Sequence, residues 1–419
     1  MTKFTHTLMF ALLFACFGAG ATLAQTRAYV TNSNDNTVSI INTQTNQVIA
    51  TVPVGLSPIA VAVTPNGRFA YVLNQQGDSV SVIKAANNTV VATIPVASFP
   101  SAIAISASGA FAYTASFSGI SVIDTATNTV VTTIPINLPV GLATASTGNR
   151  GYATHGAFIN GVTVFDTATN SVVTNIPIPV DVTIAAAVTP NGAFVYVTCL
   201  SFATGPKLAV IDTATNGVVA IVPLPPSVSA FAVAISPNGA FAYVVNTGGA
   251  TGPSSLSVID TATNTEVATV PVQRNPLGVA VTPDGAFVYT TNSLDNTVDV
   301  IDTATNTLVN IVSVGNFPRG IAFGPTVIDP PPPPDPTLTE LVQALIASGA
   351  LTQNQGAGLL DKIQEINAKL EAGHTGAACN QLSSFINQVN AFINNGTLTP
   401  AQGQPLLDAA NALKSKSGC

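Results

Sequence analysis

Charged side chains are scarce in this chain. Asp, Glu, Lys and Arg make up 7% of its 419 residues, and the formal net charge is −7. Residues 25–328 hold seven Lys or Arg and 12 Asp or Glu, which gives that region a net charge of −5. A nucleic-acid-binding face needs clustered cations that neutralise phosphates, and this composition lacks them. The sequence therefore argues against nucleic acid as the main ligand.

Residues and motifs of catalysis and metal binding are also few. The chain has three histidines, four cysteines and no tryptophan. It contains no Cys-x-x-Cys-His haem-attachment motif, no Gly-x-Ser-x-Gly, no His-Glu-x-x-His and no glycine-rich phosphate loop. A zinc or copper site would need carboxylates gathered from distant segments, because His and Cys are so rare. We predict no metal ion and no cofactor.

The apolar run nearest to membrane length lies at the N-terminus. Lys3 precedes an apolar stretch from Leu8 to Phe17, and small residues end the segment at Ala24. This pattern is typical of a secretory signal peptide covering residues 1–24, and it is too short to span a bilayer. We therefore expect an exported protein, located in the periplasm, outside the cell or at the cell surface.

A lipoprotein signal is the alternative. It would use Leu13-Phe-Ala-Cys16 as the processing site and place a lipid anchor on Cys16. Phe14 is bulkier than the residue that such sites usually carry there, so we favour the cleaved signal peptide. Elsewhere the apolar runs are strand-length and broken by turns, and no transmembrane span is predicted.

The most informative feature of the remaining chain is a repeat. Its seven tyrosines all fall in one phase of a period of about 40 residues: Tyr29, Tyr71, Tyr113, Tyr152, Tyr196, Tyr243 and Tyr289. The segment Asp-Thr-Ala-Thr-Asn recurs at 124–128, 166–170, 212–216, 260–264 and 302–306. A residue type confined to one phase of such a period indicates one supersecondary unit copied along the chain.

Each unit contains four short β-branched runs separated by Gly, Pro, Asn and Asp, as in 59–63, 69–72, 80–83 and 90–94. Four strands per repeat of this length predict a β-propeller, because a lone four-stranded sheet cannot bury both faces. The first unit lacks its first run, and the missing run stands at residues 319–325. We predict seven blades over residues 25–328, closed by pairing of that run with the N-terminal blade.

The tyrosine segments also resemble a known family. Tyr29-Val-Thr-Asn32 is the motif of the YVTN-family β-propellers of bacterial and archaeal surface and secreted proteins, and Tyr71-Val-Leu-Asn74 and Tyr243-Val-Val-Asn246 are close copies. The resemblance implies a seven-bladed ring of the surface-layer type. It implies no particular activity, since propellers host many functions.

The C-terminal region is organised differently. Six prolines among residues 330–336 predict a stiff linker at 329–337. Beyond it, residues 344–355 align with residues 391–402, and each copy has a glycine followed by a Thr N-cap with Gln three residues on. Two helical hairpins are predicted, which make a small all-α four-helix domain over residues 338–419.

This helical stretch resembles the FIMAH-type domain of bacterial exported proteins. The shared letters include Phe385-Ile-Asn-Gln-Val389 and Ala409-Ala-Asn-Ala412. The resemblance implies an extracellular accessory module. Cys379 and Cys419 share this domain, and export permits disulfides, so we pair them. Cys199 is then left as a buried, unpaired thiol.

Two recurrent side chains are given structural interpretations. The Asp of each Asp-Thr-Ala-Thr-Asn segment is interpreted as turn chemistry, because Asp accepts backbone N–H bonds and Asn tolerates the left-handed conformation. The recurrent Tyr is interpreted as a packing residue between blades, with a local partner for its hydroxyl.

Variation in length is confined to one side of the predicted ring. The turns after the first and third runs stay short, whereas residues 155–161, 199–207 and 246–255 are expanded. These share the opposite side, the loop face, with the loops that lead into each blade. Insertions on one face of a repeat protein usually mark its binding side. The candidate ligand-binding residues there are His155, Phe158, Asp181, Phe202, Lys207, Arg274, Asn275 and Arg319, with a lone solvated charge as the alternative for Arg319.

Two functions stay open at this stage. The favoured one is a monomeric, non-catalytic scaffold that holds an envelope glycan, peptide or protein partner at the loop face. The alternative is a propeller enzyme such as a lactonase or lyase, with ionisable groups at the mouth of the central funnel. Asp35, Asp78 and Asp295 could join the loop-face candidates in that role, but they lie in different repeats. Three or more of these groups in one pocket would favour the enzyme.

Overall fold

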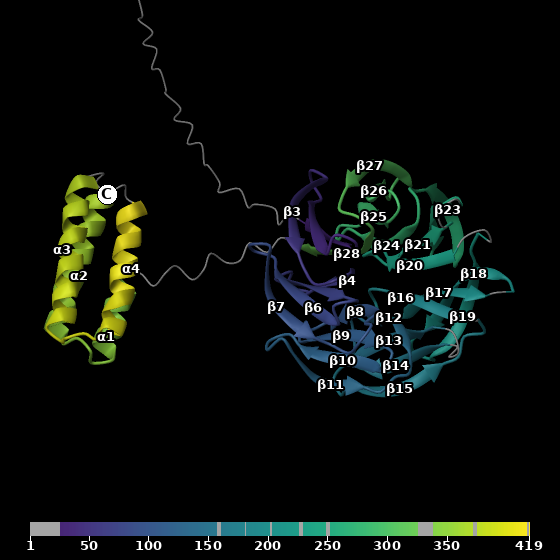
Figure 1. Ribbon diagram of the computed structural model, residues 1–419, viewed down its shortest axis with the longest axis horizontal. Helices are drawn as coiled ribbons and strands as arrows, with labels where there is room; N and C mark the ends of the chain where they lie inside the picture. The colour runs from purple at the N-terminus through teal and green to yellow at the C-terminus, as the bar shows by residue number, and fades with distance from the viewer. Residues whose placement is uncertain are drawn as a thin grey trace, which may run out of the picture. The chain divides into compact units, whose positions relative to one another are not determined.

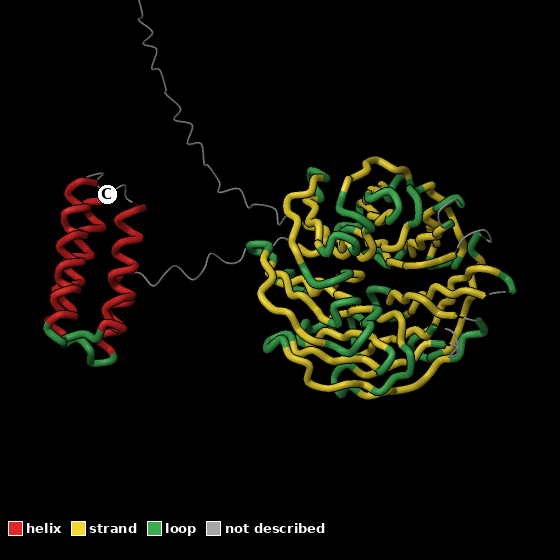
Figure 2. Tube along the Cα trace, viewed as in Figure 1, coloured by secondary structure: helices red, strands yellow, loops and turns green. Residues whose placement is uncertain are grey.

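The computed structural model describes residues 26–156, 161–180, 182–201, 203–225, 229–248, 252–325, 338–371, 375–416 and 419. The chain divides into two compact units, Met1–Ile328 and Asp329–Cys419. The described part of the first unit is built from strands and that of the second from helices (Figures 1 and 2).

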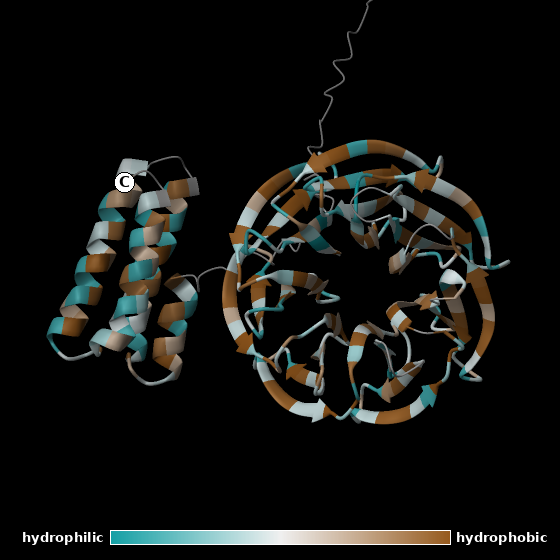
Figure 3. Cartoon of the chain, turned by 45° about the vertical axis from the view of Figure 1, so that its right-hand side comes forward, coloured by the Kyte–Doolittle hydropathy of each residue, from teal (hydrophilic) through white to brown (hydrophobic). Residues whose placement is uncertain are grey.

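The strands form seven four-stranded antiparallel sheets, blades 1 to 7, which are arranged in a ring (Figure 3). The first strand of each blade is its inner strand, and the others follow outward. From the inner strand outward, blade 1 consists of β28 (Pro318–Pro325), β1 (Thr26–Asn32), β2 (Thr37–Asn42) and β3 (Gln47–Pro53), and blade 2 of β4 (Pro58–Val63), β5 (Phe69–Asn74), β6 (Ser79–Lys84) and β7 (Thr89–Pro95). Blade 3 consists of β8 (Ala102–Ile105), β9 (Phe111–Ser116), β10 (Gly119–Asp124) and β11 (Thr129–Ile134), blade 4 of β12 (Pro139–Thr144), β13 (Arg150–His155), β14 (Val162–Asp166) and β15 (Ser171–Ile176), and blade 5 of β16 (Val182–Val188), β17 (Phe194–Ser201), β18 (Gly205–Asp212) and β19 (Gly217–Pro223). Blade 6 consists of β20 (Ser229–Ile235), β21 (Phe241–Thr247), β22 (Ser255–Asp260) and β23 (Thr265–Pro271), and blade 7 of β24 (Pro276–Val281), β25 (Phe287–Asn292), β26 (Thr297–Asp302) and β27 (Thr307–Ser313).

The ring is closed by the last strand. β28 pairs antiparallel with β1, with Tyr29 opposite Ala322 and Arg27 opposite Gly324. Blade 1 therefore contains both ends of the repeat region. The prediction of a seven-bladed propeller followed by helices is confirmed.

The recurrent tyrosine links each blade to the next. All seven tyrosine rings are buried. Tyr71 Oη in blade 2 donates to Asn128 Oδ1 at 2.7 Å, and Asn128 belongs to the Asp-Thr-Ala-Thr-Asn turn of blade 3. Two further blades repeat this contact, and Tyr289 makes it to Asn46 across the closure between blades 7 and 1. The two markers of the repeat are thus the two ends of one interblade hydrogen bond.

In blades other than blade 5, the residue three positions after the tyrosine links strands within the blade. Asn74 Nδ2 donates to Ser81 Oγ at 3.0 Å, and Asn32 makes the same contact to Ser39 at 2.9 Å. Both asparagines are buried, and their Nδ2 groups find acceptors inside the blade. We name the place of the donor in this contact the asparagine position, and along the chain it holds Asn32, Asn74, Ser116, His155, Cys199, Asn246 and Asn292. We name the place of the acceptor on the neighbouring strand the serine position, and it holds Ser39, Ser81, Ser121, Thr163, Ala209, Ser257 and Asp299.

The turn aspartates are used by their own turns, as interpreted from the sequence. Asp124 Oδ1 accepts hydrogen bonds from Ala126 N at 2.8 Å and Thr127 N at 3.0 Å. These bonds hold the pKa of the Asp124 carboxyl below its ordinary value. The turn ends at Asn128, whose φ of 55° is the left-handed conformation that Asn tolerates.

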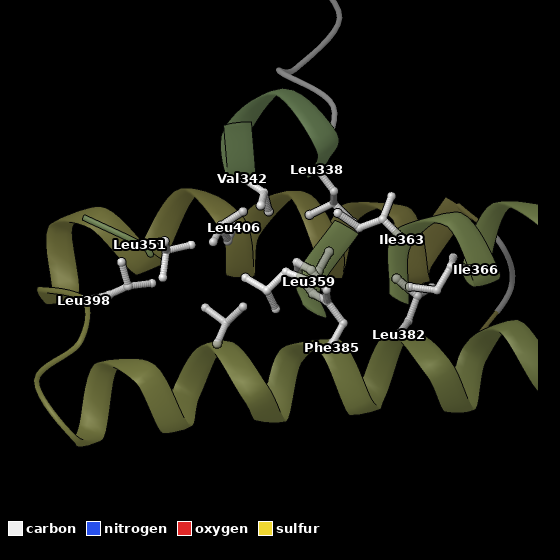
Figure 4. Close-up of a cluster of buried hydrophobic side chains, with 12 residues drawn as sticks. Leu338, Val342, Leu351, Leu359, Ile363, Ile366, Leu382, Phe385, Leu398 and Leu406 are labelled. Carbon is white, nitrogen blue, oxygen red and sulfur yellow. The ribbon is translucent and has the colours of Figure 1, made fainter. Parts of the chain in front are cut away.

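The second unit contains four helices, α1 (Leu338–Ala347), α2 (Gln353–Glu371), α3 (Thr375–Asn394) and α4 (Pro400–Lys416). Buried Leu, Ile, Val and Phe side chains from them form one core (Figure 4). Thr352 and Gln355 form a capping box before α2, since Gln355 Oε1 accepts Thr352 N at 2.9 Å. Cys379 and Cys419 form the expected disulfide, with their Cα atoms 5.6 Å apart. Within the described residues, no helix has the length and apolar character to cross a membrane.

Candidate binding site at the channel mouth

A cavity of about 430 Å³ lies where the inner strands of the blades converge. Seven of its lining residues occupy one position of the repeat, which we name the channel position. They are Ile59, Ser101, Val140, Ile184, Phe231, Leu277 and Arg319, one from each blade. Five of them are apolar, one is a serine and one is a cation. Each inner strand begins at the loop face, so this ring of side chains lies at the loop-face end of the channel, the channel mouth.

A β-bulge presents the channel position to the cavity. In blade 2 Pro58 pairs with Asn74 and Ala60 pairs with Leu73, which makes Ile59 the extra residue on the inner strand. The same shift occurs in blades 1, 4, 5, 6 and 7. A bulge re-aims a side chain and interrupts the ladder, and it recurs here at one place in the repeat.

Small residues and threonines hold the neighbouring inner strands together at this bulge. A Cβ on Gly278 would lie 2.2 Å from Arg319 O, and a Cβ on Gly320 would lie 2.6 Å from Ala60 Cα, so only glycine fits. Thr291 Oγ1 accepts Gly278 N at 2.9 Å and donates to Arg319 O at 2.6 Å. The backbone of Arg319 is therefore held in place by the adjacent blade.

Of the described residues that line the cavity, Arg319 is the charged one. Its burial lowers the pKa of the guanidinium, because loss of water disfavours the charged form. Among the described residues, no carboxylate pairs with it and its side chain has no hydrogen-bond acceptor. A partly buried cation without a counter-ion attracts an anion.

The carboxylates of the loop face join neighbouring loops. Asp35 accepts Asn316 N and Asn316 Nδ2, both at 2.7 Å. Asp78 Oδ1 accepts Phe99 N at 2.8 Å. The hydrogen bonds from Asn316 hold the pKa of Asp35 below its ordinary value. Each of these carboxylates belongs to a different blade and is committed to a loop amide, so they do not converge.

Arg274 and Asp295 are brought together by the fold. Arg274 Nε donates to Asp295 Oδ1 at 2.8 Å, and Asp295 Oδ2 also accepts Arg274 N at 2.7 Å. The side chain of Arg274 is 60% exposed, so this ion pair contributes little stability and leaves the cation accessible. Asn275 shapes the same loop, since its amide accepts from Thr247 Oγ1 and donates to Ser293 Oγ, both at 2.6 Å.

His155 lies inside blade 4, although sequence analysis places it on the loop face. It is 2% exposed and occupies the asparagine position. Its Nε2 lies 2.7 Å from Thr163 Oγ1 and its Nδ1 lies 2.9 Å from Asn137 O. Burial lowers the pKa of the imidazole and favours its neutral form. Both ring nitrogens are used within the fold, so His155 links strands rather than facing a ligand. The signal was present in the sequence, because Tyr152-Ala-Thr-His155 aligns with Tyr29-Val-Thr-Asn32 and so places His155 at the buried asparagine position.

Cys199 and Asp299 are two further departures from the internal pattern. Cys199 takes the asparagine position of blade 5 and is buried, and burial raises the pKa of its thiol to about 12, which agrees with an inert thiol. Asp299 takes the serine position of blade 7 and is fully buried. Its Oδ2 accepts Gln273 N at 2.9 Å, and burial raises the pKa of its carboxyl to about 6. Sequence analysis did not single out Asp299, which lies outside the lining of the cavity.

Of the remaining candidates, Lys207 is within the described residues, and it is not among those that line the cavity. Lys207 lies on β18, paired with Cys199 and Pro223. Phe158, Asp181 and Phe202 lie outside the described residues, as do the N-terminal segment with Cys16 and the proline-rich linker. Within the described part of the chain, no group of three or more His, Cys, Asp or Glu side chains is placed to hold a metal ion.

Comparison with protein families identifies the C-terminal unit. The FIMAH domain matches residues 336–415, which agrees with the resemblance seen in the helical sequence. No curated protein matches this chain.

Solved structures share the propeller fold. A hydrazine synthase chain from Kuenenia stuttgartiensis is 19% identical with a TM-score of 0.59, over 65% of this chain and 96% of that one. A functionally unknown protein from Desulfotomaculum acetoxidans DSM 771 is 17% identical with a TM-score of 0.61, over 71% and 98% of the two chains. The dihydro-heme d1 dehydrogenase NirN in complex with DHE is 14% identical with a TM-score of 0.50, over 71% and 74%. At these identities the likeness shows the fold alone.

Proposed function

We propose that this protein is an exported, non-catalytic binding scaffold of the YVTN type, which holds an envelope glycan, peptide or protein at its loop face and channel mouth. The N-terminal signal pattern, the disulfide between Cys379 and Cys419 and the FIMAH domain support export. A signal peptide cleaved after Ala24 is the proposed route, with a lipid anchor at Cys16 as the alternative.

The variety of the channel position carries this proposal. The tyrosine position, which packs between blades, is Tyr in all seven copies. At the channel position seven copies contain six residue types, although all line one cavity. A position that is free of the structural demands of the repeat, and gathered around a cavity, is available for ligand recognition.

The described residues give binding more support than catalysis. A lactonase- or lyase-like activity needs several ionisable groups within reach of one another. Asp35 and Asp78 are hydrogen-bonded to loop amides in separate blades, and His155 is buried inside a third. Of the candidate ionisable groups, Arg319 lines the cavity and Arg274 pairs with Asp295 on the loop face.

A binding screen tests the proposed function. The full mature chain is passed over immobilised cell-wall glycans and envelope peptides, alongside Arg274→Gln on the loop face and Arg68→Gln on the opposite face as the matched control. We expect at least a fivefold loss of retention with Arg274→Gln and none with Arg68→Gln. Equal loss with both variants would contradict a loop-face site. Turnover of a lactone panel by the wild type, abolished in Arg319→Leu, would contradict a non-catalytic role.

A further inference from the structure

We propose that the channel mouth binds a monocarboxylate with an apolar tail, and that Arg319 is the residue that binds its carboxylate. This inference rests on the proposed binding function and names the ligand class of its site. Three features of the channel mouth carry it: one unpaired cation, an apolar arc opposite polar atoms, and a cavity of limited volume.

The single cation of the site matches a ligand that carries one negative charge. Arg319 faces the cavity, and the part of the chain that the structure describes supplies no carboxylate to it. A guanidinium presents a fork of N–H donors that matches a carboxylate with two parallel hydrogen bonds. Because Thr291 and Gly278 fix its backbone, that fork is displayed from a rigid strand. Among the described residues, no second cation lines the cavity, so a dianion would keep one charge that they do not compensate, beside apolar walls.

The walls of the channel mouth are two-sided. Blades 4 to 7 contribute four apolar channel-position residues in succession, namely Val140, Ile184, Phe231 and Leu277. The polar lining comes from the other side, from Arg319 in blade 1, Gln75 in the loop between β5 and β6 and Ser101 in blade 3, and the apolar Ile59 of blade 2 lies among them. The side-chain amide of Gln75 has no hydrogen-bond partner within the described ranges, so it offers a neutral donor. A ligand with a charged head and an apolar tail satisfies both sides.

The volume of the cavity limits the ligand. About 430 Å³ lies at the lower end of the range of small-molecule sites. Each buried CH₂ strengthens binding about fourfold, so a tail that fits the apolar arc dominates the affinity. An aliphatic or aromatic acid of modest size, or the carboxyl end of a peptide with an apolar last residue, has this chemistry.

Calorimetric titration of the full mature chain tests the proposal with three probes that separate head from tail. Hexanoate carries both, acetate carries only the head, and hexan-1-ol carries only the tail. We expect hexanoate to bind at least tenfold more tightly than either of the others. A wild type that binds hexan-1-ol or inorganic phosphate as tightly as hexanoate would overturn the proposal.

Two substitutions test the site, and each introduces the residue type that another blade has at its channel position. Arg319→Leu introduces the residue found at position 277, and Phe231→Ser introduces the residue found at position 101. We expect Arg319→Leu to weaken hexanoate at least tenfold and leave hexan-1-ol within twofold, whereas Phe231→Ser weakens hexanoate and leaves acetate within twofold. Arg68→Gln, on the opposite face of the ring and outside the cavity lining, should change neither. Unchanged hexanoate affinity in Arg319→Leu would overturn the assignment.

Folding of the variants is checked by thermal unfolding. Leu at position 319 removes a partly buried cation that has no counter-ion among the described residues, so the unfolding midpoint should be equal to or above that of the wild type. Should Arg319→Leu fail to fold, Arg319→Gln keeps a polar side chain and is expected to show the same loss of hexanoate binding. Hexanoate binding by Arg319→Gln equal to that of the wild type would also overturn the proposal.

Two further arms identify the source of the carboxylate and separate this inference from the proposed function. A hexapeptide that ends in leucine with a free C-terminus is compared with its amidated form and with hexanoate. Tighter binding of the free peptide identifies a chain terminus as the source of the carboxylate, and tighter binding of hexanoate identifies a small acid. Both results support a monocarboxylate with an apolar tail as the ligand class. Absence of hexanoate and peptide binding, with Arg274-dependent retention on envelope material intact, would overturn this inference and leave the proposed function standing.

Discussion

At the scale of single residues, an aspartate and a histidine are buried at positions where other copies of the repeat have neutral side chains. Asp299 stands where other blades have Ser81 or Ser257, and His155 stands where they have Asn74. Both are ionisable and both are desolvated, with opposite consequences, since burial raises the pKa of the acid and lowers that of the base. The two residues should therefore make the stability of the propeller depend on pH in opposite directions.

Asp299→Ser should stabilise the propeller at neutral pH. The folded-state pKa of Asp299 is about 6, above the ordinary 3.8, so its contribution to stability is present below pH 3.8 and is lost as the pH rises through 6. At pH 7 to 8 the variant should gain about 1–3 kcal/mol in free energy of unfolding, and this gain should vanish near pH 4. Urea unfolding at both pH values measures it.

Serine is expected to fit at position 299 because blade 2 has a serine, Ser81, at the equivalent position with an equivalent hydrogen bond. Ser81 Oγ accepts Gly55 N at 3.3 Å, as Asp299 Oδ2 accepts Gln273 N at 2.9 Å. A variant that is less stable than the wild type at pH 8 would show that the charged carboxylate contributes more through its hydrogen bonds than it loses through burial.

His155→Asn should remove a loss of stability on the acid side. The folded-state pKa of His155 lies below the ordinary 6.5, so the stabilising contribution is present above pH 6.5 and is lost as the pH falls toward the folded-state value. The asparagine variant, with Thr163 as its partner, should fold and should differ most from the wild type below pH 6. Loss of ligand binding by a folded His155→Asn would contradict the structural role given to this residue.

At the scale of elements, the tyrosine–asparagine contact joins one blade to the next. Tyr71→Phe removes the hydrogen bond to Asn128 and should lower the free energy of unfolding by about 1 kcal/mol. Tyr243→Phe is the matched control, because its hydroxyl has no hydrogen-bond partner within the described residues and burial alone governs its pKa. Equal costs for the two variants, measured by chemical unfolding, would mean that packing rather than the hydrogen bond links the blades.

The elements were predictable from the sequence, and the channel mouth was predictable only in part. Turn residues and β-branched runs mark each strand, and the phase of Tyr29 and its copies sets the number of blades. The bulge that turns Ile59 and Arg319 into the cavity depends on pairing between strands, and no local pattern specifies which face such a residue takes. The residue after the proline that begins several inner strands, as in Pro58-Ile59 and Pro318-Arg319, was the available signal.

At the scale of the whole molecule, the closure of the ring depends on a strand far from its partner in sequence. β28 pairs with β1 and contacts the inner strands of both neighbouring blades, and Phe323 packs edge-on against Tyr289. Deletion of residues 319–325 should expose two sheet edges and give aggregated protein, as measured by light scattering after expression. A soluble deletion variant with cooperative unfolding would contradict this role of the last strand.

The central claim is that the ring presents a ligand site at its channel mouth, and the arginines themselves can report on it. The chain has five arginines, so Nε–H NMR spectra of the arginine-labelled protein should show five assignable signals, with that of Arg319 identified by its loss in Arg319→Leu. Addition of hexanoate should shift the Arg319 signal in a saturable way and leave that of Arg68 in place. A stationary Arg319 signal, or an equal drift of all five, would contradict the account.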